Sequence, residues 1–433
     1  MEKSKTEFKG SYIGIFSLNY FFQGINQSMF AVIVPIYLIM ELKAISGADI
    51  SFLLSIVLMP FAIKFIYGML SDKYALKNLG RRKPWIIIPV SFSGLLWILI
   101  PFIITTNTAF MIFTVGGVLI VLGVAIADTA IDGLILDITP KEKLGRVQGV
   151  CWGIRSVGII IGGPLIVAFY MLAGGSIELV FIGLGIVMIL TSLTILIVKE
   201  AVTHIDFSIK TNLKLIFGKG KNWRVYMFAL FNSFVDGVIF VFLSLYIIIE
   251  AGFIGSEGAT IELLETDESL YEPTAFISLF IGLGVIVGAV IGGYISDLKT
   301  RKLGVYSSLL VTTVSLLLFL IPSIVPILIF FAFLIGSSAG WRNSSYSAVV
   351  GQISTLYPEV DSTYYATCNS FVNIGTVIGL QLTGILFGAL EGLSTYTIYA
   401  ILFIFMVIIS NIGIIPFLTM DSKEYELSDK NRD

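Results

Sequence analysis

The hydrophobic pattern of the chain consists of twelve long apolar stretches separated by short polar segments. A helix needs about 20 mostly apolar residues to cross a bilayer, and each stretch has about this length or more. The pattern therefore predicts an all-α membrane protein with twelve transmembrane helices. The stretches cover residues 11–41, 48–71, 84–105, 109–136, 147–172, 177–198, 223–250, 273–297, 303–322, 325–351, 362–390 and 394–419.

Lysine and arginine gather in alternate loops between these stretches. The opposite loops hold little more than Lys43 and an acidic segment from Glu257 to Glu272, which we interpret as solvated surface. Cytoplasmic loops of membrane proteins carry an excess of Lys and Arg. We therefore expect a multi-pass protein of the cell membrane with both termini in the cytoplasm.

The composition agrees with a membrane protein. Hydrophobic residues make up 56% and charged residues 13% of the 433 residues, whereas soluble domains carry about 25% charged residues. The net charge of −2 gives no sign of nucleic-acid binding. Membrane lipid is the expected surrounding, and we expect a monomer.

Short polar motifs recur about half a chain apart. The segment Gly68–Lys73, followed by Gly80–Pro84, has a fainter copy in Gly293–Asp297, followed by Lys299–Lys302. This repetition predicts two pseudo-symmetric six-helix bundles related by an axis along the membrane normal. The N-terminal bundle would span residues 1–198 and the C-terminal bundle residues 223–433, joined by a cytoplasmic linker at 199–222. Further repeats pair Gly158 and Gly162 with Gly375 and Gly379, and Asn19 and Gln23 with Asn232 and Asp236.

The Gly68–Lys73 loop resembles the hallmark of the major facilitator superfamily, G-x-L-[SA]-D-[RK], which joins the second and third spans and ends in basic residues. Here six extra residues, Tyr74 to Leu79, precede the basic cluster. In that superfamily an acidic residue at the inner end of the fourth span latches this loop, and Asp137 resembles it. The resemblance implies a transporter fold with a cytoplasmic latch formed by Gly68, Asp72, Arg81, Arg82, Asp137 and, in the second copy, Asp297.

Two shorter resemblances concern the solute. The run Asp128–Gly133, followed by Asp137 and Lys141–Arg146, resembles the muropeptide permease, acetyl-CoA transporter and folate–biopterin transporter groups. The string Gly80–Trp85 is similar to the basic loop of glycoside and sucrose symporters. These resemblances imply an organic solute and leave its class open.

Six charged residues lie inside predicted spans, where charges are costly and usually functional. With a rise of about 1.5 Å per residue, four of them lie about 12–14 Å from the cytoplasmic ends of their spans, close to the membrane midplane. Transporters bind substrate and coupling ion at this depth. The four are Lys64, Asp128, Arg155 and Arg342; Asp236 lies deeper, at about 18 Å, and Asp132 shallower, at about 7–8 Å.

Alternative roles remain open for some of these charges. Arg155 shares a helix face with Gly158 and Gly162, which indicates close packing and a structural role as partner of Asp128 or Asp132. Its alternative role is that of a substrate anchor or a member of a switchable ion pair. Arg342 stands in the polar run Trp341–Tyr346, which indicates a water-filled cavity. We predict substrate contacts from Arg342, Lys64, Arg155, Asn19, Gln23, Asn232, Trp341, Asn343 and Tyr346, and proton coupling through Asp128, Asp132 and Asp236.

The sequence therefore predicts a secondary active transporter that moves a polar or anionic organic solute by alternating access, coupled to protons. A sugar or glycoside cation symporter is the alternative within this class, and a transport-inactive membrane sensor or assembly factor is the alternative outside it. No metal-ligand cluster, nucleophile–base pair or phosphate-binding loop is recognised, so neither a cofactor nor an enzyme activity is expected.

Overall fold

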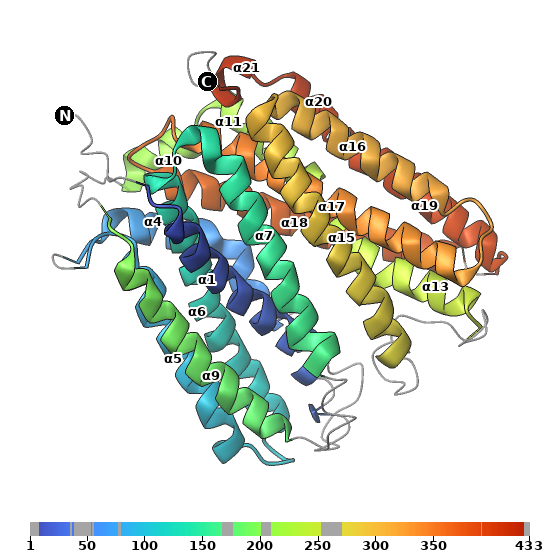
Figure 1. The fold of residues 1–433 in the computed structure, drawn as a ribbon, viewed down its shortest axis with the longest axis horizontal. Helices are drawn as coiled ribbons and strands as arrows, with labels where there is room; N and C mark the ends of the chain where they lie inside the picture. The colour runs from blue at the N-terminus through green and yellow to red at the C-terminus, as the bar shows by residue number, and fades with distance from the viewer. Residues whose placement is uncertain are drawn as a thin grey trace. The chain divides into compact units, whose positions relative to one another are not determined.

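The computed structural model describes residues 8–34, 37–38, 53, 56–76, 79–166, 176–200, 209–252, 271–390 and 392–427 (Figure 1). All named elements among these residues are helices. Lys43 and the acidic residues from Glu257 to Glu268 lie outside them. Seven described helices are long and apolar enough to cross a membrane: Lys83–Ile103, Ala109–Ile138, Ile177–Ile197, Phe276–Leu298, Val325–Ser354, Asp361–Ala389 and Tyr396–Leu418.

The chain divides into two compact units. Unit 1 comprises Met1–Pro140, Val157–Ile216 and Ser354–Ser370. Its main elements are α1 (Ser11–Ser28), α4 (Lys64–Lys73), α5 (Lys83–Ile103), α6 (Ala109–Ile138), α9 (Ile177–Leu193) and most of α10 (Ile209–Phe217).

Unit 2 comprises Lys141–Ser156, Phe217–Ile353 and Phe371–Asp433. The helices α7 (Leu144–Ile160) and α18 (Asp361–Ala389) each contribute residues to both units. The other elements of unit 2 are α11 (Gly220–Asn232), α12 (Asp236–Val238), α13 (Ser244–Glu250), α15 (Tyr271–Leu298), α16 (Arg301–Leu318), α17 (Val325–Ser354), α19 (Thr395–Ile412), α20 (Ile414–Leu418) and α21 (Ser422–Tyr425).

Aromatic side chains fill the interior of each unit. In unit 1, Trp97 stacks on Phe181 with ring centres 5.1 Å apart and donates a hydrogen bond of 2.8 Å to the Asn26 side chain. In unit 2, Tyr246 packs against Tyr399 at 4.8 Å. In unit 1, helices α5 and α9, which carry Trp97 and Phe181, run side by side (Figure 1). Because large aromatic rings bury much apolar area, these contacts stabilise the packing of the helices within each unit.

Two of the predicted charges, Lys64 and Asp236, lie next to irregular pieces of helix. The predicted span 223–250 is interrupted: α11 ends at Asn232, residues 233–235 form a turn, and α12 begins at Asp236. The hydroxyl of Ser233 donates to the Val372 carbonyl at 2.6 Å, which anchors the turn. In unit 1, a 3-10 segment, Met59–Ile63, directly precedes Lys64. In membrane transporters such breaks leave backbone groups available for binding.

Candidate functional site

A buried ion pair in unit 1 joins two of the predicted midplane charges. The ammonium of Lys64, at the start of α4, bonds to the carboxylate of Asp128 in α6. The two side chains are 7% and 3% exposed. Removing one partner of such a pair would leave an uncompensated buried charge, which is strongly destabilising.

Asp132 lies one helical turn beyond Asp128 on the same face of α6 and has neutral partners. One of its oxygens accepts the hydroxyl of Tyr20, and the other accepts the side-chain amide of Asn369 at 3.2 Å. Sequence reasoning missed Tyr20 and Asn369. Tyr20 stands beside the predicted Asn19, and Asn369 is one of several polar residues along the first half of α18, so their only signal was polarity within an apolar stretch.

Asn19 and Gln23 line a small cavity among α1, α5, α6 and α9, together with Thr191. Its volume is about 20 Å³, which is room for roughly one water molecule. Both polar atoms of the buried Gln23 amide lack a partner among the described residues. This cavity is too small to hold an organic solute.

The second buried pair belongs to unit 2 and stands at the helix break. The Nη2 atom of Arg342 in α17 bonds to Oδ1 of Asp236, the first residue of α12. The Arg342 side chain is fully buried, whereas the Asp236 side chain is 20% exposed. At the helix break, a partly exposed carboxylate therefore contacts a fully buried guanidinium.

Four other predicted site residues belong to unit 2: Tyr346, Trp341, Asn343 and Arg155. Tyr346 is buried and packs against Phe228, with ring centres 5.9 Å apart. Trp341 packs against Gly292 of α15, whereas Asn343 is half-buried. The guanidinium of Arg155 lies 4.8 Å from the Trp152 ring centre. The partner that the structure gives Asp128 is Lys64.

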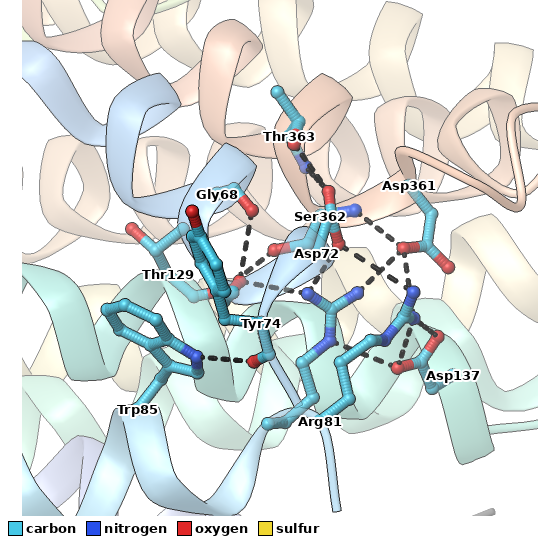
Figure 2. Close-up of polar contacts among 12 residues, drawn as sticks. Gly68, Asp72, Tyr74, Arg81, Trp85, Thr129, Asp137, Asp361, Ser362 and Thr363 are labelled. Atoms are coloured by element: carbon cyan, nitrogen blue, oxygen red, sulfur yellow. Dashed lines mark hydrogen bonds and ion pairs between the residues drawn. The ribbon is translucent and has the colours of Figure 1, made fainter. Parts of the chain in front are cut away.

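The predicted latch residues of unit 1 form one charge cluster (Figure 2). Arg82 is completely buried and binds three aspartates: Asp72 at 2.5 Å, Asp361 at 2.8 Å and Asp137 at 3.1 Å. Arg81 binds both oxygens of Asp137, at 2.8 and 2.9 Å. Burial acts to lower the pKa of Arg82, but the three aspartates outweigh it and raise the pKa above its usual value. Asp361 was missed by sequence reasoning because it lies far along the chain from the loop.

Gly68 and Asp72 both meet the start of α18. A side chain at Gly68 would lie within 2.8 Å of the Thr363 backbone. Asp72 accepts the backbone N–H of Thr363 at 2.8 Å.

In unit 2, Asp297 accepts the backbone N–H groups of Gly145 at 3.0 Å and Arg146 at 2.6 Å, and pairs with Arg301 at 3.0 Å. Asp72, near the end of α4, and Asp297, near the end of α15, thus each bind both an arginine and a helix N-terminus. Negative charge is stabilised at a helix N-terminus.

Two glutamates that sequence reasoning missed close the same loops. Glu200 accepts the backbone N–H groups of Arg81 and Arg82 at 2.9 and 2.8 Å. Glu426 accepts those of Arg301 and Lys302 at 3.0 and 2.8 Å. Burial raises the pKa of Glu200 above its usual value despite these hydrogen bonds. Both glutamates resemble ordinary loop charges in the sequence, so no local signal marks them.

Among the described residues, no group of three or more His, Cys, Asp or Glu side chains is placed to hold a metal ion. The described residues offer ion pairs and hydrogen bonds: each unit has one buried cation–carboxylate pair and one charged cluster, around Asp72 in unit 1 and around Asp297 in unit 2.

Comparisons with known proteins bear on this arrangement. The family model described as Major Facilitator Superfamily matches residues 16–264. A protein of Arabidopsis thaliana, described as probable folate-biopterin transporter 4, is 24% identical over 204 residues, which cover 46% of this chain and 40% of that protein. The match therefore spans less than half of that relative's length.

Solved structures extend the likeness to nearly the whole chain. A variant of the E. coli fucose:proton symporter aligns with a TM-score of 0.63 at 14% identity, covering 93% of this chain and 98% of that chain. The same symporter in an outward conformation aligns with a TM-score of 0.62 at 14% identity, with the same coverage. At this identity the alignments show a shared fold.

Proposed function

The chain belongs to the Major Facilitator Superfamily, and on this premise we propose that it is a secondary active transporter for a polar or anionic organic solute. The solute crosses the membrane by alternating access, in exchange for the downhill movement of protons. Members of this family are membrane transporters rather than enzymes, which fits the absence of a nucleophile–base constellation in the sequence.

One observation carries the proposal: each unit buries a cation–carboxylate pair beside an irregular piece of helix. Lys64 and Asp128 stand next to the 3-10 segment Met59–Ile63, and Arg342 and Asp236 stand at the break after Asn232. A fully packed scaffold gains little from such pairs, because desolvation offsets most of their attraction. Buried charges at discontinuous helices are typical of substrate and ion sites in transporters.

The pairs also provide the basis for proton coupling. A buried carboxylate is stable as an anion while its cation stays in place. When a solute or a conformational change removes the cation, the carboxylate is more stable as the protonated acid. Asp128 and Asp236 are our candidates for this role, and Asp132, held by Tyr20 and Asn369, is a third.

We further propose the architecture in which this site works. Twelve spans form two six-helix bundles, residues 1–198 and 223–433, joined by the cytoplasmic segment 199–222. Both termini are cytoplasmic. The repeated contacts of Asp72 with the start of α18 and of Asp297 with the start of α7 support the duplication.

The relatives support an organic solute. One is described as a folate-biopterin transporter and the other as a fucose:proton symporter. A sugar or glycoside symporter remains the second candidate, because the accessible partner at the helix break is the Asp236 carboxylate, which can accept hydroxyl groups. A transport-inactive sensor is the candidate from outside transport.

Uptake by proteoliposomes tests the proposal. The purified chain is reconstituted, a pH gradient is imposed, and uptake is measured for organic carboxylates, organic phosphates and neutral glycosides. We expect accumulation of at least one class that is abolished by an uncoupler. Uptake of none, with correctly inserted protein, favours the sensor; accumulation driven by sodium instead of protons contradicts the coupling ion.

A further inference from the structure

We infer that Arg342 binds an oxyanion group of the solute, a carboxylate or a phosphate, and that this group takes the place of Asp236 on the guanidinium. The inference rests on the proposed function, because it names the solute class for the same site. Two observations support it: N–H groups of Arg342 lack acceptors, and the side chains of Arg342 and Asp236 are unequally exposed.

The first step is the deficit of acceptors around Arg342. A guanidinium has five N–H donors and no acceptor. Its Nη2 atom bonds to Asp236, whereas its buried Nε and Nη1 atoms have no partner among the described residues. A buried donor without a partner carries its full desolvation cost. The guanidinium of Arg342 therefore has fewer hydrogen-bond acceptors around it than it has N–H donors.

The second step is that other unmatched groups close to the pair in the sequence are also donors. The buried side-chain nitrogens of Asn232, four residues before Asp236, and of Trp341, the residue before Arg342, lack partners within the described part of the chain. The next unmatched group along α17 is the hydroxyl of Ser347, about 7.5 Å further along the helix axis. A ligand that satisfies such groups supplies oxygen acceptors, which fits an oxyanion better than a cation or an amine.

The third step is the geometry of the guanidinium. An oxyanion binds arginine through two parallel hydrogen bonds, either at the edge formed by Nε and Nη2 or at the edge formed by Nη1 and Nη2. The Nη2 atom contributes one of its two N–H bonds to each edge, and Asp236 bonds to Nη2. Because the guanidinium is fully buried and Asp236 is its partly exposed partner, a solute that makes a two-point contact takes the place of Asp236. Solute and Asp236 therefore compete for the guanidinium of Arg342.

The fourth step is access. The Arg342 side chain is 0% exposed and the Asp236 side chain 20% exposed, so an arriving solute meets Asp236 first. Displaced into this surrounding without its cation, Asp236 is more stable with a proton. One oxyanion bound thus corresponds to one proton bound, which gives symport in a fixed ratio at this site.

Ligand-induced stabilisation of the purified chain tests the inference without knowledge of the natural solute. The probes are acetate and inorganic phosphate, compared with chloride at equal ionic strength, and the readout is the melting temperature. We expect both probes to raise the melting temperature of the wild type, and to raise that of Asp236→Asn further because Nη2 is released. The rise should be lost in Arg342→Gln and retained in Arg224→Gln, which removes an exposed arginine from α11.

A double variant and a pH series make the result decisive. Arg342→Gln combined with Asp236→Asn removes both charges, so it should fold even if Arg342→Gln alone does not, and it should show no rise. With acetate, which stays ionised from about pH 6 to about pH 8, the wild-type rise should grow at the lower pH while that of Asp236→Asn stays constant. An equal rise in wild type and double variant, or no rise in any protein, overturns the inference.

The proteoliposome assay separates this inference from the proposed function. If a neutral glycoside is accumulated and no carboxylate or phosphate is, the oxyanion site is wrong while the transporter assignment stands. If the probes stabilise the chain as expected but no solute is transported, the site stands and transport fails.

Discussion

Asp72 binds the first turn of α18 through a single residue, Thr363. One carboxylate oxygen accepts both the backbone N–H and the hydroxyl of Thr363. The other oxygen pairs with Arg82 at 2.5 Å. The loop aspartate thus joins a fully buried arginine to a helix N-terminus, and both interactions require its negative charge.

This relationship predicts that Asp72→Asn impairs the conformational cycle more than solute binding. The asparagine keeps the size of the side chain but leaves Arg82 with less opposing charge. The maximal transport rate should fall while the solute dissociation constant stays near that of the wild type. Asp297→Asn, in the equivalent contact with Arg146 and Arg301, should act in the same direction. Affinity that falls as steeply as transport contradicts a latch role.

The burial of Glu200, which accepts the backbone N–H groups of Arg81 and Arg82, predicts that the stability of the folded protein depends on pH. Because the pKa of Glu200 is raised, the folded protein keeps this proton to a higher pH than the unfolded chain does. The contribution to stability is fully present below the usual glutamate pKa of about 4.3 and is lost as the pH rises through the raised value. Glu200→Gln keeps an acceptor for the two N–H groups and has no such proton.

The melting temperature of the wild type, relative to that of Glu200→Gln, should therefore fall as the pH rises above about 4. Glu359→Gln, at an exposed position, controls for the loss of a glutamate charge. A difference between wild type and Glu200→Gln that stays constant over this range would show that burial does not control the proton on Glu200.

Close helix packing predicts a strong effect at Gly379 and a weak one at Gly384, both in α18. A methyl group at Gly379 would lie 1.9 Å from the Phe234 carbonyl oxygen, whereas nothing lies within 4 Å of one at Gly384. Gly379→Ala should cost about 1–3 kcal/mol through overpacking. Gly384→Ala should be neutral or stabilise by up to about 1 kcal/mol through helix propensity. Equal melting temperatures for the two variants would contradict the packing.

The sequence predicted the long apolar helices and the charged residues that form buried ion pairs, but not all of their partners. Hydropathy and motif spacing brought Asp72, Arg82 and Asp137 together because they lie in one loop or beside it. Asp361 and Glu200 join the same cluster through chain folding, for which a single sequence carries no local signal. The break after Asn232 was also missed, since residues 232–236 contain no proline or glycine and the turn is held by a tertiary contact of Ser233.

The buried pairs predict that coupling and binding can be separated. Asp128→Asn and Asp236→Asn keep size and polarity but cannot exchange a proton. If one of these aspartates carries the coupling proton, its variant should equilibrate solute across the membrane and exchange it, without accumulating it against a gradient. Uptake under a pH gradient and counterflow in its absence measure the two properties. Normal accumulation by both variants would show that neither aspartate carries the proton.

The last prediction concerns Arg342→Lys, which keeps the positive charge and loses the planar fork. A lysine ammonium forms single hydrogen bonds and cannot bind an oxyanion at two parallel points. Hydrogen bonds to charged groups contribute about 1.5–3 kcal/mol each, so the dissociation constant of an anionic solute should rise roughly tenfold or more. The pair with Asp236 can still form, so folding should be less affected than binding. Arg224→Lys, at an exposed position of α11, is the matched control and should bind solute as the wild type does. If a neutral sugar is the best solute and Arg342→Lys transports it at the wild-type rate, Arg342 does not recognise the charge of the solute.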